Sequence, residues 1–142
     1  MKRILILCTG NSCRSKMAQA VLQHLDNNLI VCSAGTQPAK EVNPLAVRVI
    51  YEVNMPIVNL TTHDVKEYES KSWNYVITVC DHARETCPVF SSKVGQRLHI
   101  GFSDPAMAKG SEEEKLSVFR KVRNEIINSF NTFYRQISKK DF

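Results

Sequence analysis

Residues 3–15, RILILCTGNSCRS, pass from an apolar run through a polar turn into a helical pattern. The run at residues 3–8 has the length of a strand, and continuous apolar strands are typical of parallel sheets buried on both faces. After it, apolar residues recur at helical spacing, at Met17, Ala18, Val21, Leu22 and Leu25. The segment therefore predicts a strand, loop and helix unit of a parallel α/β fold.

The rest of the chain also alternates between predicted strands and predicted helices. β-Branched and aromatic runs predict further strands at residues 29–34, 75–79 and 97–102. Helices are expected from Pro44 to before Pro56, briefly at 64–69, and after a capping box of Ser111 and Glu114. The last helix carries a long apolar stripe, at Leu116, Phe119, Val122, Ile126, Phe130, Phe133 and Ile137. We expect a single catalytic domain over residues 1–142, with helices flanking a four-stranded parallel sheet.

The composition is that of an ordinary soluble domain. Of the 142 residues, 43% are hydrophobic and 23% are charged, which argues against disorder. The net charge of +5 suits anionic ligands, but basic residues do not alternate with aromatic ones, so we expect no nucleic-acid partner. Apolar stretches are too short for an export signal or a membrane span, so we expect no membrane association and a cytoplasmic location. Structural disulfides are rare in the cytoplasm, so the five cysteines need a chemical explanation.

The turn from Cys8 to Ser15 has the composition of an anion-binding loop. Backbone N–H groups in a glycine-containing turn ahead of a helix form a nest for anions, and an arginine adds a bidentate fork that fits tetrahedral oxyanions. The predicted oxyanion-binding residues are Thr9, Gly10, Asn11, Ser12, Cys13, Arg14 and Ser15.

Cys8 is the first residue of this loop, so the loop can change the reactivity of its thiol. Helix N-termini and nearby arginines lower the pKa of cysteine thiols, so we expect a thiolate nucleophile at Cys8. Ser15 is expected to donate a hydrogen bond that favours the thiolate, and Asn11 to hold the loop in shape. The alternative is that Cys8 merely ends a buried strand while Arg14 lies on the helix surface.

A second pair of cysteines, Cys80 and Cys87, follows the third predicted strand in a polar loop. Three interpretations compete: the two thiols are inert, they bind zinc together with His82, or they form a reversible disulfide. A polar loop is a poor place to bury thiols, and structural zinc requires shorter paired spacings and four ligands. Redox exchange therefore fits best.

Asp104 precedes Pro105 after the fourth predicted strand. A carboxylic acid at this point can protonate a departing oxygen, although Asp-Pro is also a common turn dipeptide. Since the ligands of parallel sheets bind at the carboxyl ends of the strands, we expect Cys8, Cys80 and Asp104 to converge.

The string CTGNSCRS at residues 8–15 resembles the phosphate loop of the low-molecular-weight protein tyrosine phosphatase superfamily. The Cys-x6-Cys-Pro segment at 80–88, GFSDPA at 101–106 and GSEEEK at 110–115 narrow the resemblance to the thioredoxin-coupled arsenate reductases of that superfamily. Ala106 and Met107 follow the Asp-Pro, where the tyrosine phosphatases usually have tyrosines. The resemblance implies a phosphatase-like three-layer sandwich. It also implies four roles: Cys8 as nucleophile, Arg14 as oxyanion ligand, Ser15 as support for the thiolate and Asp104 as general acid.

The reaction implied by this resemblance is the reduction of arsenate to arsenite, with phosphate and sulfate as competing oxyanions. Cys8 attacks arsenate, Cys80 attacks Cys8 as arsenite leaves, and Cys87 attacks Cys80 to leave a disulfide that thioredoxin reduces. A disulfide requires Cα atoms within about 7 Å, so residues 81–87 are expected to be mobile. We expect a monomer without a tightly bound cofactor, with residual phosphatase activity.

Some members of the family bind potassium beside the loop through an asparagine, a serine and a glutamate. Asn11 and Ser33 match this set, but Gln19 stands where the glutamate is common, which makes a potassium site doubtful. Cys32 lies in an apolar strand and is expected to be inert.

Two rival functions remain open. A low-molecular-weight phosphatase acting on phosphotyrosine or small phosphoesters needs no second cysteine pair. A non-catalytic sensor of redox state or oxyanions needs no general acid.

Overall fold

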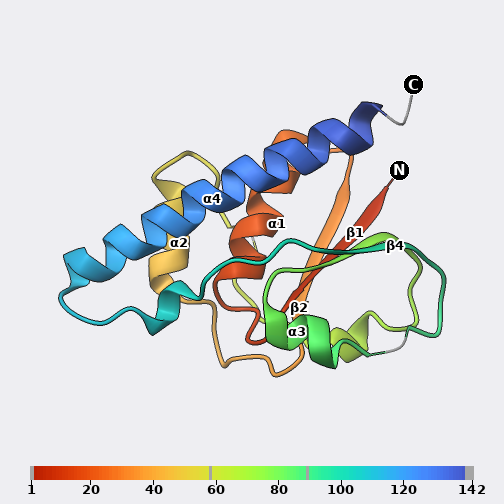
Figure 1. Cartoon of the computed structure of the whole chain (residues 1–142), viewed down its shortest axis with the longest axis horizontal. Coiled ribbons are helices and arrows are strands. Elements are labelled where there is room, and N and C mark those ends of the chain that lie inside the picture. The colour runs from red at the N-terminus through yellow and green to blue at the C-terminus, as the bar shows by residue number, and fades with distance from the viewer. Residues whose placement is uncertain (1, 58, 89, 140–142) are drawn as a thin grey trace.

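Strands and helices alternate along the chain, as the sequence predicts (Figure 1). The computed structural model describes residues 2–57, 59–88 and 90–139. In chain order the elements are β1 (Arg3–Cys8), α1 (Arg14–Leu25), β2 (Ile30–Gly35), α2 (Pro44–Tyr51), the 3-10 turn η1 (Val65–Glu67), β3 (Trp73–Thr78), α3 (Asp81–Thr86), β4 (Val94–His99), the 3-10 turn η2 (Pro105–Met107) and α4 (Glu112–Lys139). Within these described ranges, every helix is too short or too polar to cross a membrane.

The strands form one parallel sheet in the order β2-β1-β3-β4. Leu7 in the central strand β1 pairs with Ala34 of β2 on one side and with Thr78 of β3 on the other. The chain leaves β1 toward β2 and returns past β1 to β3, so the direction of winding reverses between β1 and β3. Ligands of doubly wound sheets bind at the carboxyl ends of the strands at such a switch point. Cys8 ends β1 and Cys80 follows β3, so both lie at this point.

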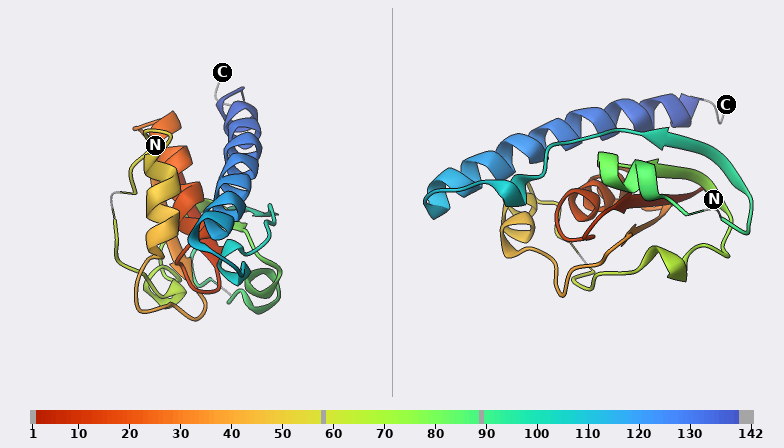
Figure 2. Two further views of the ribbon diagram at one scale, coloured as in Figure 1. Left: turned by 90° about the vertical axis from the view of Figure 1, so that its left-hand side faces the viewer. Right: turned by 60° about the horizontal axis from the view of Figure 1, so that its bottom comes forward.

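Helices cover both faces of the sheet, which produces the three predicted layers. On one face α1, α2 and α4 pack against one another (Figure 2, left). Tyr75 of β3 points to this side, where its ring meets Phe133 of α4 edge to face, with the ring centroids 5.3 Å apart. Side chains alternate along a strand, so Val76 and Thr78 point to the other face, where they line a pocket with Cys87 at the end of α3.

The predicted bounds of β1 are confirmed, whereas those of the other strands were partly wrong. β2 is shifted by one residue, β3 begins at Trp73 instead of residue 75, and β4 spans Val94–His99 instead of 97–102. The brief helix expected at 64–69 is the 3-10 turn η1. β4 pairs only with β3, at an edge of the sheet, and its first half is mostly exposed. Its start, VGQR, therefore lacks the apolar pattern that marks a buried strand.

The cysteine-rich segment that was predicted to be a loop contains the helix α3. Cys80 is its N-cap, and the Ala83 N–H donates to the Cys80 Sγ at 3.4 Å. Asp81 in the first turn suits the positive end of the helix dipole. With six residues, α3 is too short to produce a readable amphipathic period, which explains the error.

The predicted start of the last helix is confirmed. The Glu114 N–H donates to the Ser111 Oγ at 3.2 Å, and the Ser111 N–H donates to the Glu114 Oε1 at 3.1 Å. This reciprocal pair is the predicted capping box. The apolar stripe of α4 is buried as expected, at Leu116, Phe119, Val122, Ile126, Phe130, Phe133 and Ile137.

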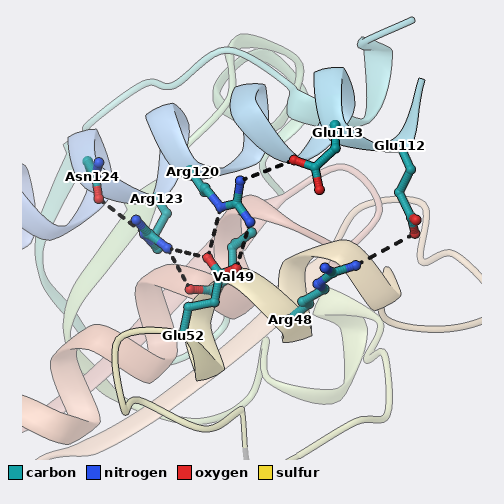
Figure 3. Close-up of polar contacts among 8 residues, drawn as sticks. All are labelled: Arg48, Val49, Glu52, Glu112, Glu113, Arg120, Arg123 and Asn124. Atoms are coloured by element: carbon teal, nitrogen blue, oxygen red, sulfur yellow. Dashed lines mark hydrogen bonds and ion pairs between the residues drawn. The ribbon is translucent and has the colours of Figure 1, made fainter. Parts of the chain in front are cut away.

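An ion-pair network joins the end of α2 to α4 (Figure 3). The Glu52 carboxylate accepts two hydrogen bonds from Arg120, at 3.0 and 2.8 Å, and one from Arg123 at 2.9 Å. Arg123 is buried and also donates to the Val49 carbonyl at 2.9 Å. The hydrogen bonds and charge of Arg120, followed by those of Arg123, lower the pKa of Glu52 to about 2. The ionised form of Glu52 is therefore favoured by folding.

We predict that Glu52→Gln lowers the free energy of unfolding at pH 7. Because the folded-state pKa of Glu52 is below its ordinary value of 4.5, its contribution is fully present above about pH 4.5 and is lost as the pH falls toward 2. Urea unfolding across this range is expected to show the difference between variant and wild type shrinking with decreasing pH. Glu113→Gln is the matched control, because Glu113 is largely exposed and lies 3.8 Å from Arg120. A difference that is constant with pH would contradict the prediction.

Candidate active site

The loop between β1 and α1 wraps around the Cys8 thiol. The Asn11 N–H donates to the Cys8 Sγ at 3.1 Å, and the Ser15 Oγ lies 2.9 Å from the same sulfur. Cys8 itself is 2% exposed, so the loop and the sheet shield it from bulk water on most sides. The predicted contact between Ser15 and Cys8 is present in the structure.

Asn11 organises this loop from its centre. Its backbone is in the left-handed region, with φ of 53°, a conformation that asparagine tolerates better than most residues. Its side-chain Nδ2 donates to the Ser15 Oγ at 2.9 Å and to the Ser33 Oγ at 3.0 Å, and its Oδ1 accepts from the His63 N–H at 2.9 Å. Across the 2.9 Å between them either the Ser15 hydroxyl or the Cys8 thiol can be the donor, and the Ser15 hydroxyl donates when Cys8 is a thiolate. A hydrogen bond of that direction favours the thiolate over the thiol.

The residues considered for potassium are engaged with one another in this network. The Ser33 hydroxyl donates to the Gln19 Oε1 at 2.6 Å, while the Asn11 amide presents its NH2 group to Ser33. Among the described residues, histidine, cysteine, aspartate and glutamate side chains form no group of three or more suited to a metal ion. The expectation that Gln19 disfavours a potassium site at Asn11 and Ser33 stays a prediction.

Arg14 and Asp104 meet across the mouth of the loop. The Arg14 Nη1 donates to the Phe102 carbonyl at 3.0 Å, and its Nη2 lies 3.7 Å from the Asp104 Oδ2. Asp104 also accepts from the Ala106 N–H at 3.0 Å, so the predicted turn at Asp-Pro is present. The carboxylate is half-buried beside the arginine. Arg14 is therefore not loose on the helix surface, as the alternative interpretation required.

Cys80 reaches the same site from the end of β3. Its Sγ lies 3.3 Å from the Thr9 Oγ1 of the oxyanion loop. One pocket collects the three segments and is lined by Thr9, Arg14, Cys80, Asp81, His82, Gly101, Phe102, Ser103 and Asp104. Cys80 and Asp104 therefore converge, as expected, on the loop that surrounds Cys8, although Cys8 itself does not line the pocket. Cys80 is only 5% exposed, so the expectation that this segment would not bury a thiol was wrong.

Cys87 lies at the opposite end of α3 from Cys80, as the C-cap of that helix. It is half-buried, and the Arg97 Nη1 donates to its Sγ at 3.7 Å. All five cysteines are free thiols. Burial raises the pKa of Cys13 to about 12 and also raises the pKa of Cys32. These two thiols stay protonated at neutral pH, which agrees with an inert Cys32.

Two residues near the loop have features that sequence reasoning missed. Lys16 is 1% exposed, and among the described residues its Nζ has no hydrogen-bond partner. Burial lowers its pKa to about 8, while attraction to Cys8 acts in the opposite direction. Gly35 ends β2 directly against the loop: a Cβ there would lie 2.4 Å from the Thr9 carbonyl oxygen and 3.0 Å from the Asn11 nitrogen. A lysine in a helix and a glycine after a strand are common in protein sequences, so neither residue could be recognised before the packing around it was known.

Comparisons with known proteins show which protein family this chain resembles in sequence and structure. Residues 3–141 match the family model described as low molecular weight phosphotyrosine protein phosphatase. The chain is 42% identical to an arsenate reductase of Halalkalibacterium halodurans over 133 residues, which is 93% of this chain and 94% of that protein. A solved structure of an arsenate reductase in its phosphate-binding state superposes with a TM-score of 0.80 at 25% identity, covering 96% of this chain and 99% of the other. The thioredoxin-dependent arsenate reductase of Corynebacterium glutamicum shares the fold, with a TM-score of 0.71 at 22% identity over 99% of this chain and 63% of the other.

We predict that Gly35→Ala disrupts the loop around Cys8. The added methyl group meets backbone atoms of Thr9 and Asn11, which cannot move without displacing the N–H groups of the loop. Gly10→Ala is the matched control, because a Cβ at Gly10 makes only ordinary contacts of 3.7 and 3.8 Å with side chains. Calorimetric titration with inorganic phosphate is expected to show at least a tenfold weaker affinity for Gly35→Ala, a loss of about 1.4 kcal/mol, and little change for Gly10→Ala. Equal affinities in the two variants would refute the role of Gly35.

Proposed function

We propose that this chain, which belongs to the low molecular weight phosphotyrosine protein phosphatase family, is an enzyme that reduces arsenate to arsenite through a relay of three thiols. The observation that carries the proposal is the contact of the Cys80 sulfur with Thr9 of the oxyanion loop. Hydrolysis of a phosphoester needs one nucleophilic thiol, whereas here a second thiol lies against the loop that holds the first. The arsenate reductase with 42% identity over nearly the whole chain supports the same function.

Arsenate would bind in the loop from Cys8 to Ser15. The backbone N–H groups of Thr9 to Ser15 and the Arg14 guanidinium suit a tetrahedral oxyanion, and phosphate and sulfate would compete because they share that geometry. Arg14 is held at the mouth by the Phe102 carbonyl and lies beside Asp104. The bound oxyanion is thereby placed between a nucleophile and a carboxyl group.

In the first step the Cys8 thiolate attacks arsenic. The Asn11 N–H and the Ser15 hydroxyl stabilise the thiolate, and Asp104 protonates the departing oxygen, which leaves as water. The product is an adduct in which the Cys8 sulfur is bonded to arsenic. The same residues would act on a phosphoester, which is why family membership supports residual phosphatase activity as the second candidate.

In the second step the Cys80 thiolate attacks the Cys8 sulfur. The electron pair of the sulfur–arsenic bond passes to arsenic, which leaves as arsenite, and a disulfide joins Cys8 to Cys80. Cys80 is suited to this attack because the Ala83 N–H donates to its sulfur and Thr9 holds it against the loop. The two electrons of the reduction come from these two thiols.

In the third step Cys87 attacks Cys80 and frees Cys8. Cys80 and Cys87 are the two caps of the six-residue helix α3. Seven steps of helical rise from one cap to the other separate their Cα atoms by roughly 10 Å. A disulfide needs a separation below about 7 Å, so α3 has to unwind as the bond forms. Except for Ala83, the residues of α3 are exposed, so unwinding of the helix exposes little buried surface.

The resulting disulfide would be reduced by thioredoxin, the reductant named for the Corynebacterium glutamicum protein. Five free cysteines suit the cytoplasm, where thiols stay reduced.

We predict that Cys80→Ser abolishes arsenate turnover and spares hydrolysis of an aryl phosphate, because only the relay needs the second thiol. Cys8→Ser is expected to abolish both activities. NADPH consumption with arsenate, thioredoxin and thioredoxin reductase measures the first activity, and release of nitrophenol from p-nitrophenyl phosphate measures the second. Cys32→Ser is the control and should retain both. Undiminished arsenate turnover in Cys80→Ser would contradict the relay. A wild type inert toward arsenate would favour the phosphatase function.

We also predict faster hydrogen exchange over residues 81–87 in the oxidised protein than in the reduced one. The amide hydrogen bonds of α3 must break when Cys80 and Cys87 join, whereas those of α1 need not change. Exchange followed by mass spectrometry, in reduced protein and in protein carrying the Cys80–Cys87 disulfide, compares the two segments. Uniformly slow exchange across residues 81–87 in both redox states would count against the third step.

A further inference from the structure

Cys87 lies at the end of α3 that is far from the oxyanion loop. The reactivity of its thiol depends on the groups that surround it there. The pocket around it is lined by Val76, Thr78, Arg84, Arg97, Leu98 and His99. The Cys87 Sγ lies 3.7 Å from the Pro88 carbonyl oxygen, an acceptor that only the protonated thiol can use. Burial raises the pKa of Cys87, and the negative charge of Glu69 acts in the same direction. These surroundings favour the unreactive thiol.

The third step of the relay requires the opposite protonation state, because the thiolate is the form of cysteine that attacks a disulfide. Arg97 is placed to favour it. Its Nη1 donates to the Cys87 Sγ at 3.7 Å, and both its charge and this hydrogen bond lower the pKa of Cys87. A guanidinium keeps its own proton at neutral pH, so it stabilises the thiolate without taking part in proton transfer.

Two contacts hold Arg97 in this position. Its backbone is paired with Val76 of β3, on the face of the sheet where α3 ends. Its guanidinium lies over the buried ring of Phe90, 5.3 Å from the centroid. A cation over an aromatic face is attracted to it, which restricts a side chain that is otherwise flexible.

The other charged or titratable groups of this pocket are directed elsewhere. Arg84 is paired with Asp81 at 3.7 Å. His99 is held between the Thr78 hydroxyl at 2.8 Å and the Asp81 carboxylate at 3.2 Å. Among the described residues, Arg97 is the cation in hydrogen-bond contact with Cys87.

We propose that Arg97 is a catalytic residue of the relay, which stabilises the thiolate form of Cys87 that attacks Cys80; this inference rests on the proposed function. In that step a bond forms between the sulfurs of Cys87 and Cys80, the bond between Cys80 and Cys8 breaks, and Cys8 leaves as a thiolate. The exchange conserves electrons and requires no proton. Negative charge passes from the side of Arg97 to the oxyanion loop, where the Asn11 N–H and the Ser15 hydroxyl receive it.

The first test is alkylation of Cys87 by iodoacetamide in the reduced, full-length protein, measured against pH by mass spectrometry of its peptide. The rate follows the thiolate fraction, and the reagent is uncharged, so arginine cannot steer it. Arg97→Gln is expected to lower the rate at pH 7 about two- to fivefold, the range for exposed charge pairs, and to move the midpoint to higher pH. Arg97→Lys should retain most of the rate, and the control Arg84→Gln should match wild type. Equal rates and midpoints in Arg97→Gln and wild type would overturn the proposal.

The second test separates this inference from the proposed function. In a single turnover with arsenate, quenched with acid and analysed by peptide mapping, Arg97→Gln is expected to accumulate the Cys8–Cys80 disulfide that wild type passes on to Cys87. No accumulation in Arg97→Gln, despite slower alkylation, would overturn a role of Arg97 in the relay. A wild type that forms neither the Cys8–Cys80 nor the Cys80–Cys87 disulfide with arsenate would overturn the proposed function itself, whatever the alkylation of Cys87 shows.

Discussion

The pairing of β1 with β2 on one side and β3 on the other is the constraint on which the rest of the structure depends. It places the end of a largely apolar strand at the point where the sheet reverses its direction of winding. Cys8 is the last residue of that strand, and Cys80 follows its neighbour. Two thiols that are 72 residues apart in sequence therefore approach the loop between β1 and α1. The edge strand β4 then delivers Asp104 to the same pocket.

The loop itself is stabilised by hydrogen bonds that centre on Asn11. The Asn11 amide donates to Ser15 and Ser33, and the Ser15 hydroxyl lies 2.9 Å from the Cys8 sulfur. Asn11 is buried and in the left-handed conformation, so the arrangement depends on an asparagine at that position. Gly35 permits the close approach of β2 to this loop. The chemistry of Cys8 is thus built from backbone geometry as much as from side-chain charge.

α3 separates the two downstream thiols and so imposes an order on them. Cys80 is buried against the oxyanion loop, while Cys87 is half-buried beside Arg97 on the other face of the sheet. In the proposed relay the first exchange joins Cys8 to the thiol that lies against the loop, and the second requires the helix to unwind. Because α3 is short and mostly exposed, this helix can open while the sheet and the α1, α2 and α4 layer stay intact.

The sequence by itself determined the features that rest on local patterns. The apolar run of β1, the loop composition from Cys8 to Ser15 and the capping box of Ser111 predicted the α/β fold and a candidate oxyanion-binding loop, because each is set by residues close together in the chain. Only the tertiary structure decided the bounds of the exposed strand β4, the helical state of residues 81–86 and the burial of Cys80. The same holds for Gly35, Lys16 and Arg97, whose importance depends on neighbours that lie far away in sequence. Burial, close approach and ion pairing are properties of the packed chain, so they cannot be predicted from the spacing of residues along one segment.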